Sequence, residues 1–488
     1  MEFQIPDFYP AAAELFVAGM ALIVLLVVSF LRRGAATAAY WLTQATVIGM
    51  AFIALLSGRD VGFTFGQMYI DDPLGDFLKL WVALSVATSL LYSRRYLIDR
   101  GLESAEYYLI VMFAMLGSMI LITAGSLLTV YLGLEMLSLS SYALVAINRD
   151  SIQSTEAGMK YFVLGALASG LLLYGISMVY GATQTLNIID VARALFEQQA
   201  NRPVLLFGLV FVVAGVGFKM GAVPFHMWLP DVYQGAPTAV TILIASAPKL
   251  AAFAMAFRLL AVGFWDFAEQ WQMMLILLAI GSLVIGNLGA IAQTNIKRML
   301  AYSTIGHMGF ILLGLASGVV GGERYLADNA YSAALFYVVT YVLTTLASFG
   351  MLLLMSRAGF EADQIDDFKG LNKRSSWWAA MMAIVMFSMA GIPFFVGFFS
   401  KFLVLQFIVA TDHVWLAVFA VMMSLIGAFY YLRVVKLMFF DEPIDDSPIV
   451  AGLGVQVVLS TNVLAIAVLG LFPNVLMYFC SLVIHGSF

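Results

Sequence analysis

Apolar residues recur in long runs from one end of this sequence to the other. A helix that spans a membrane needs about 20 mostly apolar residues, because lipid offers no partner to an exposed backbone N–H or C=O. Breaking the sequence at charged residues and at Gly, Pro and Asn clusters predicts fourteen such helices. Their approximate ranges are 11–31, 38–57, 74–93, 106–123, 125–146, 157–181, 203–222, 237–262, 271–293, 299–319, 330–356, 377–400, 413–438 and 451–480.

Two connections between these runs have a predicted structure of their own. The fourth and fifth runs meet at Ala124 and Gly125, which predicts a tight hairpin. The segment Leu186–Gln199 places apolar residues at helical spacing beside charged ones, which predicts an amphipathic helix on the outer face of the membrane. Elsewhere the longest polar stretch is Arg357–Ser376, and no long linker divides residues 1–488, so we expect one integral membrane domain.

Composition supports a membrane protein and excludes several other classes. Of 488 residues, 62% are hydrophobic and only 11% are charged, too few for the surface of a soluble globule of this size. The first apolar run ends at Arg32 and Arg33 rather than at a small-residue cleavage site, so we expect a retained helix. The single cysteine, Cys480, excludes an intrachain disulfide and a cysteine-ligated cluster, and no basic patch indicates nucleic acid.

Basic residues are distributed unevenly between alternate loops. Cytoplasmic loops carry an excess of Lys and Arg, so the richer set predicts the cytoplasmic side and places both termini outside. The richer set has fifteen basic residues, namely Arg32, Arg33, Arg94, Arg95, Arg100, Arg149, Lys160, Lys297, Arg298, Arg357, Lys369, Lys373, Arg374, Arg433 and Lys436. The loops on the opposite side have five, namely Arg59, Arg193, Arg202, Arg258 and Arg324.

Four basic residues belong to neither loop set and are assigned to the predicted helices, and one carboxylate lies in the middle of a helix with no other charge near it. They are Glu135, Lys79, Lys219, Lys249 and Lys401. A charge at the bilayer centre costs about 2.5–3.5 kcal/mol on insertion scales, so each must be paired, solvated or functional. Glu135 is either a proton-accepting carboxylate or a neutral acid bonded to Ser138 or Ser140.

The lysines differ in how easily they can reach water. Lys219 precedes Gly221 and Pro224, which predict a broken helix, although it is near enough to the helix end to extend to the interface. Lys249 lies mid-helix after Pro248, and Lys401 follows another Gly- and Pro-rich break at 391–397. A buried lysine near a carboxylate can gain and lose a proton, so these positions favour proton transport.

The sequence gives weaker arguments for a transport role of the other ionisable groups. His226 and His307 either relay protons or are hydrogen-bonded core residues. Lys79 follows Asp76 by three residues and is interpreted as a boundary ion pair near water. Two broken helices also fit inverted repeats, with residues 106–262 and 271–438 as the repeats and 11–93 and 451–480 as flanking helices.

Three long motifs carry a family resemblance that extends over essentially the whole chain. FKMGAVPFHMWLPDVYQGAPT (218–238), QTNIKRMLAYSTIGHMGF (293–310) and AGIPFFVGFFSKF (390–402) closely resemble subunit N of bacterial NADH:quinone oxidoreductase, respiratory complex I. Related antiporter-like subunits have a different sequence where this chain has DVYQGAPT. One of them has a glutamate at the position of Lys401. Pro248 departs from the family pattern.

The resemblance implies an all-α polytopic fold of fourteen transmembrane helices, with two inverted five-helix repeats and broken helices seven and twelve. It implies a hydrated proton path through Glu135, Lys219, Lys249 and Lys401, neighbouring membrane-arm subunits, and a place in the bacterial inner membrane with both termini periplasmic. FMN and iron–sulfur clusters are implied in partner subunits, which transfer electrons from NADH to quinone. This chain itself is expected to hold no cofactor or metal.

Three functions compete at this stage. The first is a proton-translocating subunit of this redox enzyme, and the second is a subunit of a multi-component sodium/proton antiporter without redox coupling. The third, a structural scaffold, is disfavoured because buried ionisable residues are costly. For the proton-translocating subunit we also expect Glu135 and Lys219 to be electrostatically coupled, since Glu135 is the only carboxylate of suitable depth near Lys219 in the first repeat.

Overall fold

The computed structural model describes residues 5–31, 33–57, 61–197, 201–319, 324–356, 358–445, 447–449 and 451–487, with the side chains of 324–326 excepted. Arg32, Arg59 and Arg357, which entered the charge comparison, lie outside the described residues, as does the side chain of Arg324. No ligand or partner accompanies the chain.

The chain is a bundle of long apolar helices, as the hydropathy pattern predicts. Thirteen helices among the described residues are long and apolar enough to cross a membrane. They comprise α1 (Ala12–Phe30), α2 (Ala35–Leu56), α3 (Pro73–Asp99), α4 (Ala105–Ile122), α5 (Leu127–Val145), α6 (Ile152–Thr183), α8 (Arg202–Met220), the run from α10 (Thr238–Ala245) through α11 (Ala247–Ala256) to the π-helix η1 (Phe257–Gly263), η2 (Trp265–Phe267) with α12 (Ala268–Ile291), α13 (Ile296–Ala316), α14 (Arg324–Met355), α18 (Val414–Phe440) and α19 (Leu453–Leu471).

Three expected spans are divided in the structure. The run 377–400 becomes α16 (Ser376–Ala390) and α17 (Val396–Ala410), each too short to count among the thirteen. The run 451–480 becomes α19 and α20 (Pro473–Gly486), because the prolyl nitrogen of Pro473 has no hydrogen to donate within a continuous helix. The run 237–262 is interrupted at Ser246, two residues before Pro248.

Shorter elements lie at the ends of the bundle. A two-stranded antiparallel hairpin, β1 (Gly62–Thr64) and β2 (Tyr69–Asp71), precedes α3. The predicted amphipathic helix is α7 (Ile188–Phe196), which buries Ile188, Val191 and Leu195 and exposes an Asp190–Arg193 pair. The remaining elements are α9 (Trp228–Gly235), the 3-10 helix η3 (Ile365–Phe368) and α15 (Leu371–Arg374).

Polar caps determine where several helices begin. The Asp72 side chain accepts from the backbone N–H of Gly75, and Pro73 opens α3 with its backbone angle already helical. Ser104, Ser126 and Asn295 cap α4, α5 and α13 in the same way. The α4–α5 connection therefore needs only residues 123–126, which confirms the tight hairpin.

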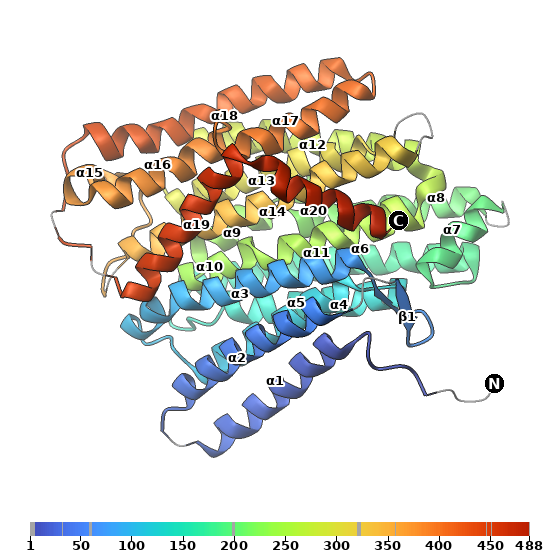
Figure 1. Cartoon of the computed structure of the whole chain (residues 1–488), viewed down its shortest axis with the longest axis horizontal. Coiled ribbons are helices and arrows are strands. Elements are labelled where there is room, and N and C mark those ends of the chain that lie inside the picture. The colour runs from blue at the N-terminus through green and yellow to red at the C-terminus, as the bar shows by residue number, and fades with distance from the viewer. Residues whose placement is uncertain are drawn as a thin grey trace.

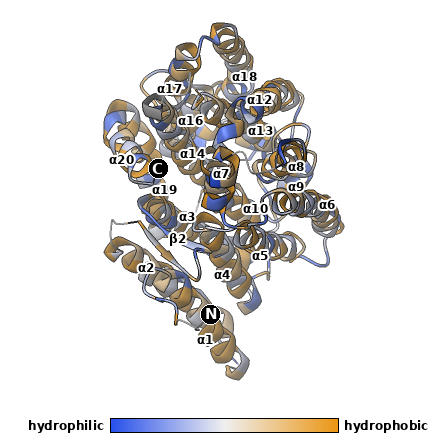
Figure 2. Cartoon of the chain, turned by 90° about the vertical axis from the view of Figure 1, so that its right-hand side faces the viewer, coloured by the Kyte–Doolittle hydropathy of each residue, from blue (hydrophilic) through white to orange (hydrophobic). Residues whose placement is uncertain are grey.

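Helices in the middle of the bundle are almost entirely covered by protein. The spanning window of α14 is fully buried and that of α13 is 94% buried, whereas those of α1 and α19 are 28% buried. The view along the bundle places α1 at one edge and α18 at the other, with apolar residues over much of the outside (Figure 2). Small residues bring helices together, because a Cβ on Gly117 of α4 would meet the backbone of Leu137 of α5.

Both ends of the described chain lie at one end of the bundle, hereafter the terminus end (Figure 1). The Tyr69 hydroxyl donates to the carbonyl of Pro10, just before α1, at 3.0 Å. The Leu74 N–H, at the start of α3, donates to Ser487 at 2.9 Å. The helix α15 lies at the opposite end (Figure 1).

Candidate functional site

Two helices end on a glycine in the left-handed conformation. Gly221, with φ +80°, ends α8, and Gly391, with φ +85°, ends α16. At each end two successive N–H groups donate to one carbonyl: those of residues 221 and 222 to Gly217, and those of 391 and 392 to Phe387, all at 2.8–3.1 Å. This turn ends a helix without a steric penalty only at glycine, and it leaves the final carbonyls free for another donor.

Lys249 supplies that donor at the end of α8. Its ammonium donates to the carbonyl of Met220 at 2.9 Å and that of Lys219 at 3.4 Å, and it lies 5.3 Å from the ring centroid of Trp228. The side chain comes from α11 and is buried. Carbonyls at a helix end carry partial negative charge, which stabilises a cation where no carboxylate is present.

Lys401 has the corresponding position at the end of α16. Its ammonium donates to the carbonyls of Met389 and Ala390, both at 3.0 Å, and to the hydroxyl of Ser424 on α18 at 2.9 Å. The lysine itself is carried by α17, on the far side of the interruption. The structure therefore places two predicted lysines in the same chemical setting, each at the carboxyl end of an interrupted helix.

Lys219 points in another direction, towards α5. Its ammonium donates to the hydroxyl of Ser138 at 2.7 Å, and Ser138 donates to the carbonyl of Leu134. Glu135 lies one turn from Ser138 and interacts electrostatically with Lys219. Among the described residues, however, no ion pair within 4.0 Å joins Glu135 to Lys219, so a serine hydroxyl lies where the sequence suggested a carboxylate contact.

His307 is the centre of a buried tyrosine network. Its Nδ1 is 2.8 Å from the hydroxyl of Tyr337 and its Nε2 is 3.1 Å from that of Tyr431. Tyr431 in turn is hydrogen-bonded to Ser303. Both ring nitrogens therefore have hydroxyl partners, an arrangement through which a proton can pass from one side of the ring to the other.

Small cavities adjoin these groups. One of about 10 Å³ is lined by Ser138 and Lys219, and another of the same size is lined by His307, Lys401 and Ser424. A third connects His307 to Ser388 at the α16 end. Each is near the minimum volume that holds one water molecule and has polar groups to bind it.

Tyr233 lies between the two halves of this site. It belongs to α9, as does Trp228, and its buried hydroxyl has no hydrogen-bond partner in the described part of the chain. Tyr341 interacts with it electrostatically, is hydrogen-bonded to Thr304 at 2.9 Å, and has its ring 5.5 Å from that of His307. Polar groups thus lead from α9 to His307.

His226 is not brought into this line. It lies between α8 and α9, is half-buried, and its buried Nδ1 has no hydrogen-bond partner in the residues that the structure describes. A polar surface cavity of about 130 Å³ opens beside α9 instead, lined by Lys160, Asp231 and Arg298 among others. Burial alone raises the pKa of Asp231, but hydrogen bonds from Lys160 and Arg298 outweigh it and lower that pKa below its ordinary value.

Three basic residues differ from their sequence interpretation. Lys79 is not near water: it is 1% exposed and pairs with Glu14 as well as Asp76. Arg258, which we assigned to an outer loop, is buried in η1 and pairs with Asp72. Lys297, assigned to a cytoplasmic loop, is buried in α13 and donates to the carbonyl of Ala236. Sequence reasoning missed these because their partners are distant along the chain.

The described residues contain no group of three or more His, Cys, Asp or Glu side chains that could hold a metal. The one cysteine, Cys480, is buried. What the site offers chemically is a series of protonatable and hydroxyl groups in an apolar bundle.

Comparisons with known proteins show what the chain as a whole is similar to. Residues 124–427 match the family described as NADH:quinone oxidoreductase/Mrp antiporter, TM. NADH-quinone oxidoreductase subunit N from Azoarcus sp. (strain BH72) is 60% identical over 100% of this chain and 99% of its own length. A chain of respiratory complex I from Thermus thermophilus with bound aureothin has a TM-score of 0.80 and 29% identity, covering 95% of this chain and 98% of that one. A chain of the Mrp complex from Dietzia sp. DQ12-45-1b shares the fold, with a TM-score of 0.81 and 20% identity over 97% of both chains.

Proposed function

Because the chain belongs to the family of NADH-quinone oxidoreductase subunit N, we propose that it moves protons across the membrane as one subunit of that complex. The observation that carries the proposal is the pair of lysines bound to carbonyls at interrupted helix ends, Lys249 at α8 and Lys401 at α16. A scaffold has no need of ammonium groups there, since each is costly to place in an apolar bundle.

The proposed proton path is a line of exchangeable groups. Glu135 and Ser138 begin it, Lys219 and Lys249 continue it, and His307 and Lys401 complete it. The Lys219–Ser138 bond, the Tyr233–Tyr341 neighbourhood and the water-sized cavities beside Lys219 and Lys401 support this order. His226 stays a weaker candidate, because its ring is half-buried and its Nδ1 has no hydrogen-bond partner among the described residues.

Transfer along this line requires each lysine to change partners. An ammonium keeps its proton while it donates to helix-end carbonyls, two at Lys249 and two at Lys401, because acceptors in a fixed geometry favour the charged form. If the helix end or the adjacent serine moves, that stabilisation is lost and the apolar surroundings favour the neutral amine. A small displacement at α8 or α16 would then release a proton to the next group or to a bridging water.

The matching helix ends also support a repeat organisation. We propose residues 106–262 and 271–438 as inverted repeats, with the seventh helix broken after α8 and the twelfth between α16 and α17. Close glycine contacts join α4 to α5 and also α12 to α13, where a Cβ on Gly286 would meet the backbone of Gly306. Such repeats place a shared site near the membrane midplane.

In the assembled enzyme this chain would supply the membrane-bound, proton-moving part. Neighbouring membrane-arm subunits are its proposed partners, and FMN and iron–sulfur clusters in other subunits would carry electrons from NADH to quinone. The bacterial inner membrane is its proposed location, with both termini on the periplasmic side. A sodium/proton antiporter without redox coupling is the alternative; the shared fold at 20% identity leaves it weaker than the subunit with 60% identity.

Purification from the native membrane tests this proposal. Purification through a tag on the chain should recover NADH dehydrogenase activity together with the chain. The recovered complex, placed in vesicles, should move protons across the membrane only when NADH is supplied. Recovery of the chain with sodium/proton exchange activity and without NADH oxidation would favour the antiporter instead.

A further inference from the structure

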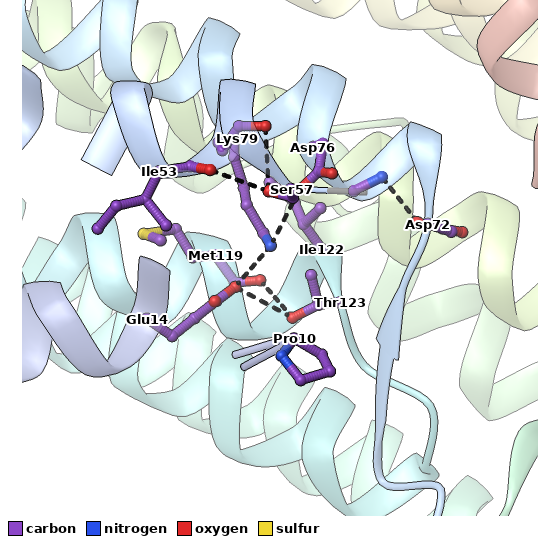
Figure 3. Close-up of polar contacts among 12 residues, drawn as sticks. Pro10, Glu14, Ile53, Ser57, Asp72, Asp76, Lys79, Met119, Ile122 and Thr123 are labelled. Carbon is purple, nitrogen blue, oxygen red and sulfur yellow. Dashed lines mark hydrogen bonds and ion pairs between the residues drawn. The ribbon is translucent and has the colours of Figure 1, made fainter. Parts of the chain in front are cut away.

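A second group of buried ionisable residues lies outside the proposed proton path, on the helices that precede residue 124, where the family match begins. Lys79 on α3 is the centre of this terminus cluster. Its ammonium lies 3.2 Å from Glu14 on α1 and 3.5 Å from Asp76, and it donates to the hydroxyl of Tyr69 at 3.0 Å. Figure 3 shows Glu14, Asp76 and Lys79 converging from their helices.

The cluster has more acidic than basic groups. Glu14, Asp71 and Asp76 face the single ammonium of Lys79, and all three interact with it electrostatically. Asp72, the next carboxylate, is neutralised separately by the two-point contact with Arg258 at 2.8 and 3.0 Å. With every group ionised, the cluster would hold an excess of two negative charges.

Burial makes such an excess costly. Glu14 is 6% exposed and Asp71 is 7% exposed, while the Asp76 side chain is 13% exposed. Buried carboxylates that lack a counter-charge take up protons, because the neutral acid avoids both desolvation and mutual repulsion. Burial first, and then Glu14 and Asp72, raise the pKa of Asp71 to about 6 in spite of Lys79.

Asp71 also has an unused bonding capacity. Its Oδ1 is buried and accepts no hydrogen bond from the described residues, whereas Glu14 accepts from Tyr69 at 2.9 Å and Thr123 at 3.4 Å. A carboxylate oxygen without a donor is expensive when ionised. Its neighbour Asp76 interacts with the half-exposed hydroxyl of Ser57 at the end of α2, which gives the cluster a polar connection towards the surface.

We propose that the terminus cluster is a proton-holding site of this chain, in which Asp71 carries the proton beside Glu14, Asp76 and Lys79. The ligand is a proton delivered by water at the terminus end of the bundle. The charged and titratable groups that face it are Glu14 from α1, Tyr69 and Asp71 from β2, Asp72, Asp76 and Lys79 from the start of α3, and Arg258 from η1. From α20, His485 instead faces Asp328, at 3.7 Å.

Infrared spectra of the intact complex in vesicles, recorded as the pH is raised from 5 to 8, test this inference. We expect one carboxylic acid absorption that disappears near pH 6, is missing in Asp71→Asn, and persists in the control Asp190→Asn, which removes an exposed carboxylate at the same end. The measurement detects proton binding directly, so it is independent of whether the lysine path pumps.

Charge neighbours distinguish a proton-holding cluster from an isolated buried acid. Lys79→Met should move the same titration to higher pH, because the ammonium favours the ionised carboxylate, and Glu14→Gln should move it to lower pH for the opposite reason. If one variant fails to assemble, the other still gives a shift of the titration in a predicted direction. The proposal would be overturned if Asp71→Asn kept the carboxylic acid absorption. It would also be overturned if neither Lys79→Met nor Glu14→Gln shifted the pH of the titration.

Discussion

The ammonium groups of Lys249 and Lys401 each contact backbone carbonyls at the end of a helix. A carbonyl is a dipole rather than a full charge, so the stabilisation it gives depends strongly on distance and alignment. That dependence suits the proton release that we propose for these lysines. By contrast, Lys79 faces three carboxylates, and its position is therefore suited to holding charge rather than to passing it on.

Ser138 accepts a hydrogen bond from Lys219, whereas the sequence suggested it as a partner of Glu135. Ser138→Ala removes the acceptor 2.7 Å from the Lys219 ammonium and should slow NADH-driven proton pumping several-fold, because a buried ammonium loses a partner. Ser140→Ala is the matched control, since that hydroxyl, on the same helix, donates to Met136 and forms no contact with Lys219. Equal pumping in the two variants, measured in vesicles, would remove Ser138 from the path.

The terminus cluster gives stability a defined pH dependence. The pKa of Asp71 is raised from 3.8 to about 6, so its contribution to folding is fully present below about pH 4 and is lost as pH rises through 6. At pH 7.5 the ionised Asp71 should cost on the order of 1–3 kcal/mol. Asp71→Asn should therefore raise the thermal midpoint of the complex at pH 7.5 and leave it little changed at pH 4.5. A lower thermal midpoint for Asp71→Asn at pH 7.5 would contradict the prediction that ionised Asp71 destabilises the chain.

At the scale of elements, α8 and α16 end alike although their sequences differ. Each ends on a left-handed glycine followed shortly by proline, and each exposes carbonyls to a lysine from another helix. The sequence suggested breaks near these positions, because Gly and Pro act through the local backbone, and α8 and α16 end at Gly221 and Gly391. It did not predict the interruption at Ser246 or the π-helix η1, which arise within an apolar run that carries no glycine before residue 263.

Gly391→Ala tests whether the helix end positions the lysine. A Cβ at this residue would lie 3.1 Å from the Lys401 ammonium and would also bear the cost of φ +85°, about 1–2 kcal/mol. We expect a several-fold loss of proton pumping. Gly34→Ala is the control, because Gly34 has φ +74° with nothing within 4 Å of the added Cβ, and should only destabilise the chain slightly. Similar pumping in both variants would indicate that the helix end does not control Lys401.

For the whole molecule, sequence patterns predicted the class of fold and most helix ranges, because a membrane requires long apolar runs. They isolated Lys219, Lys249, Lys401 and Glu135 for the same reason, since charges within such runs are conspicuous. They could not identify the contacts that tie Lys79 to Glu14, 65 positions apart, or Arg258 to Asp72. Those pairings depend on how α1, α3 and η1 assemble, and no local pattern records that assembly.

Orientation in the membrane is a prediction of the charge distribution. The loop at Ser375 should face the cytoplasm and Asp7 should face outward, so an impermeant thiol reagent applied to intact cells should label Asp7→Cys and not Ser375→Cys. The native Cys480 is buried and should contribute little background. Labelling of Ser375→Cys from outside would reverse the orientation. The helix α15, next to Ser375, lies at the end of the bundle opposite the N-terminus (Figure 1), so one site serves as the control for the other.

The central claim is that buried lysines carry protons while other subunits carry electrons. The most direct test measures protons pumped per NADH oxidised by the purified complex in vesicles, with Lys219→Ala compared against Lys373→Ala, which removes an exposed lysine paired with Glu442. Glu135→Gln should behave like Lys219→Ala to a lesser degree. The account predicts that Lys219→Ala lowers the pumping rate about tenfold or more, equivalent to about 1.4 kcal/mol, while Lys373→Ala leaves it unchanged. An assembled Lys219→Ala complex that pumps at the unmodified rate and stoichiometry would contradict it.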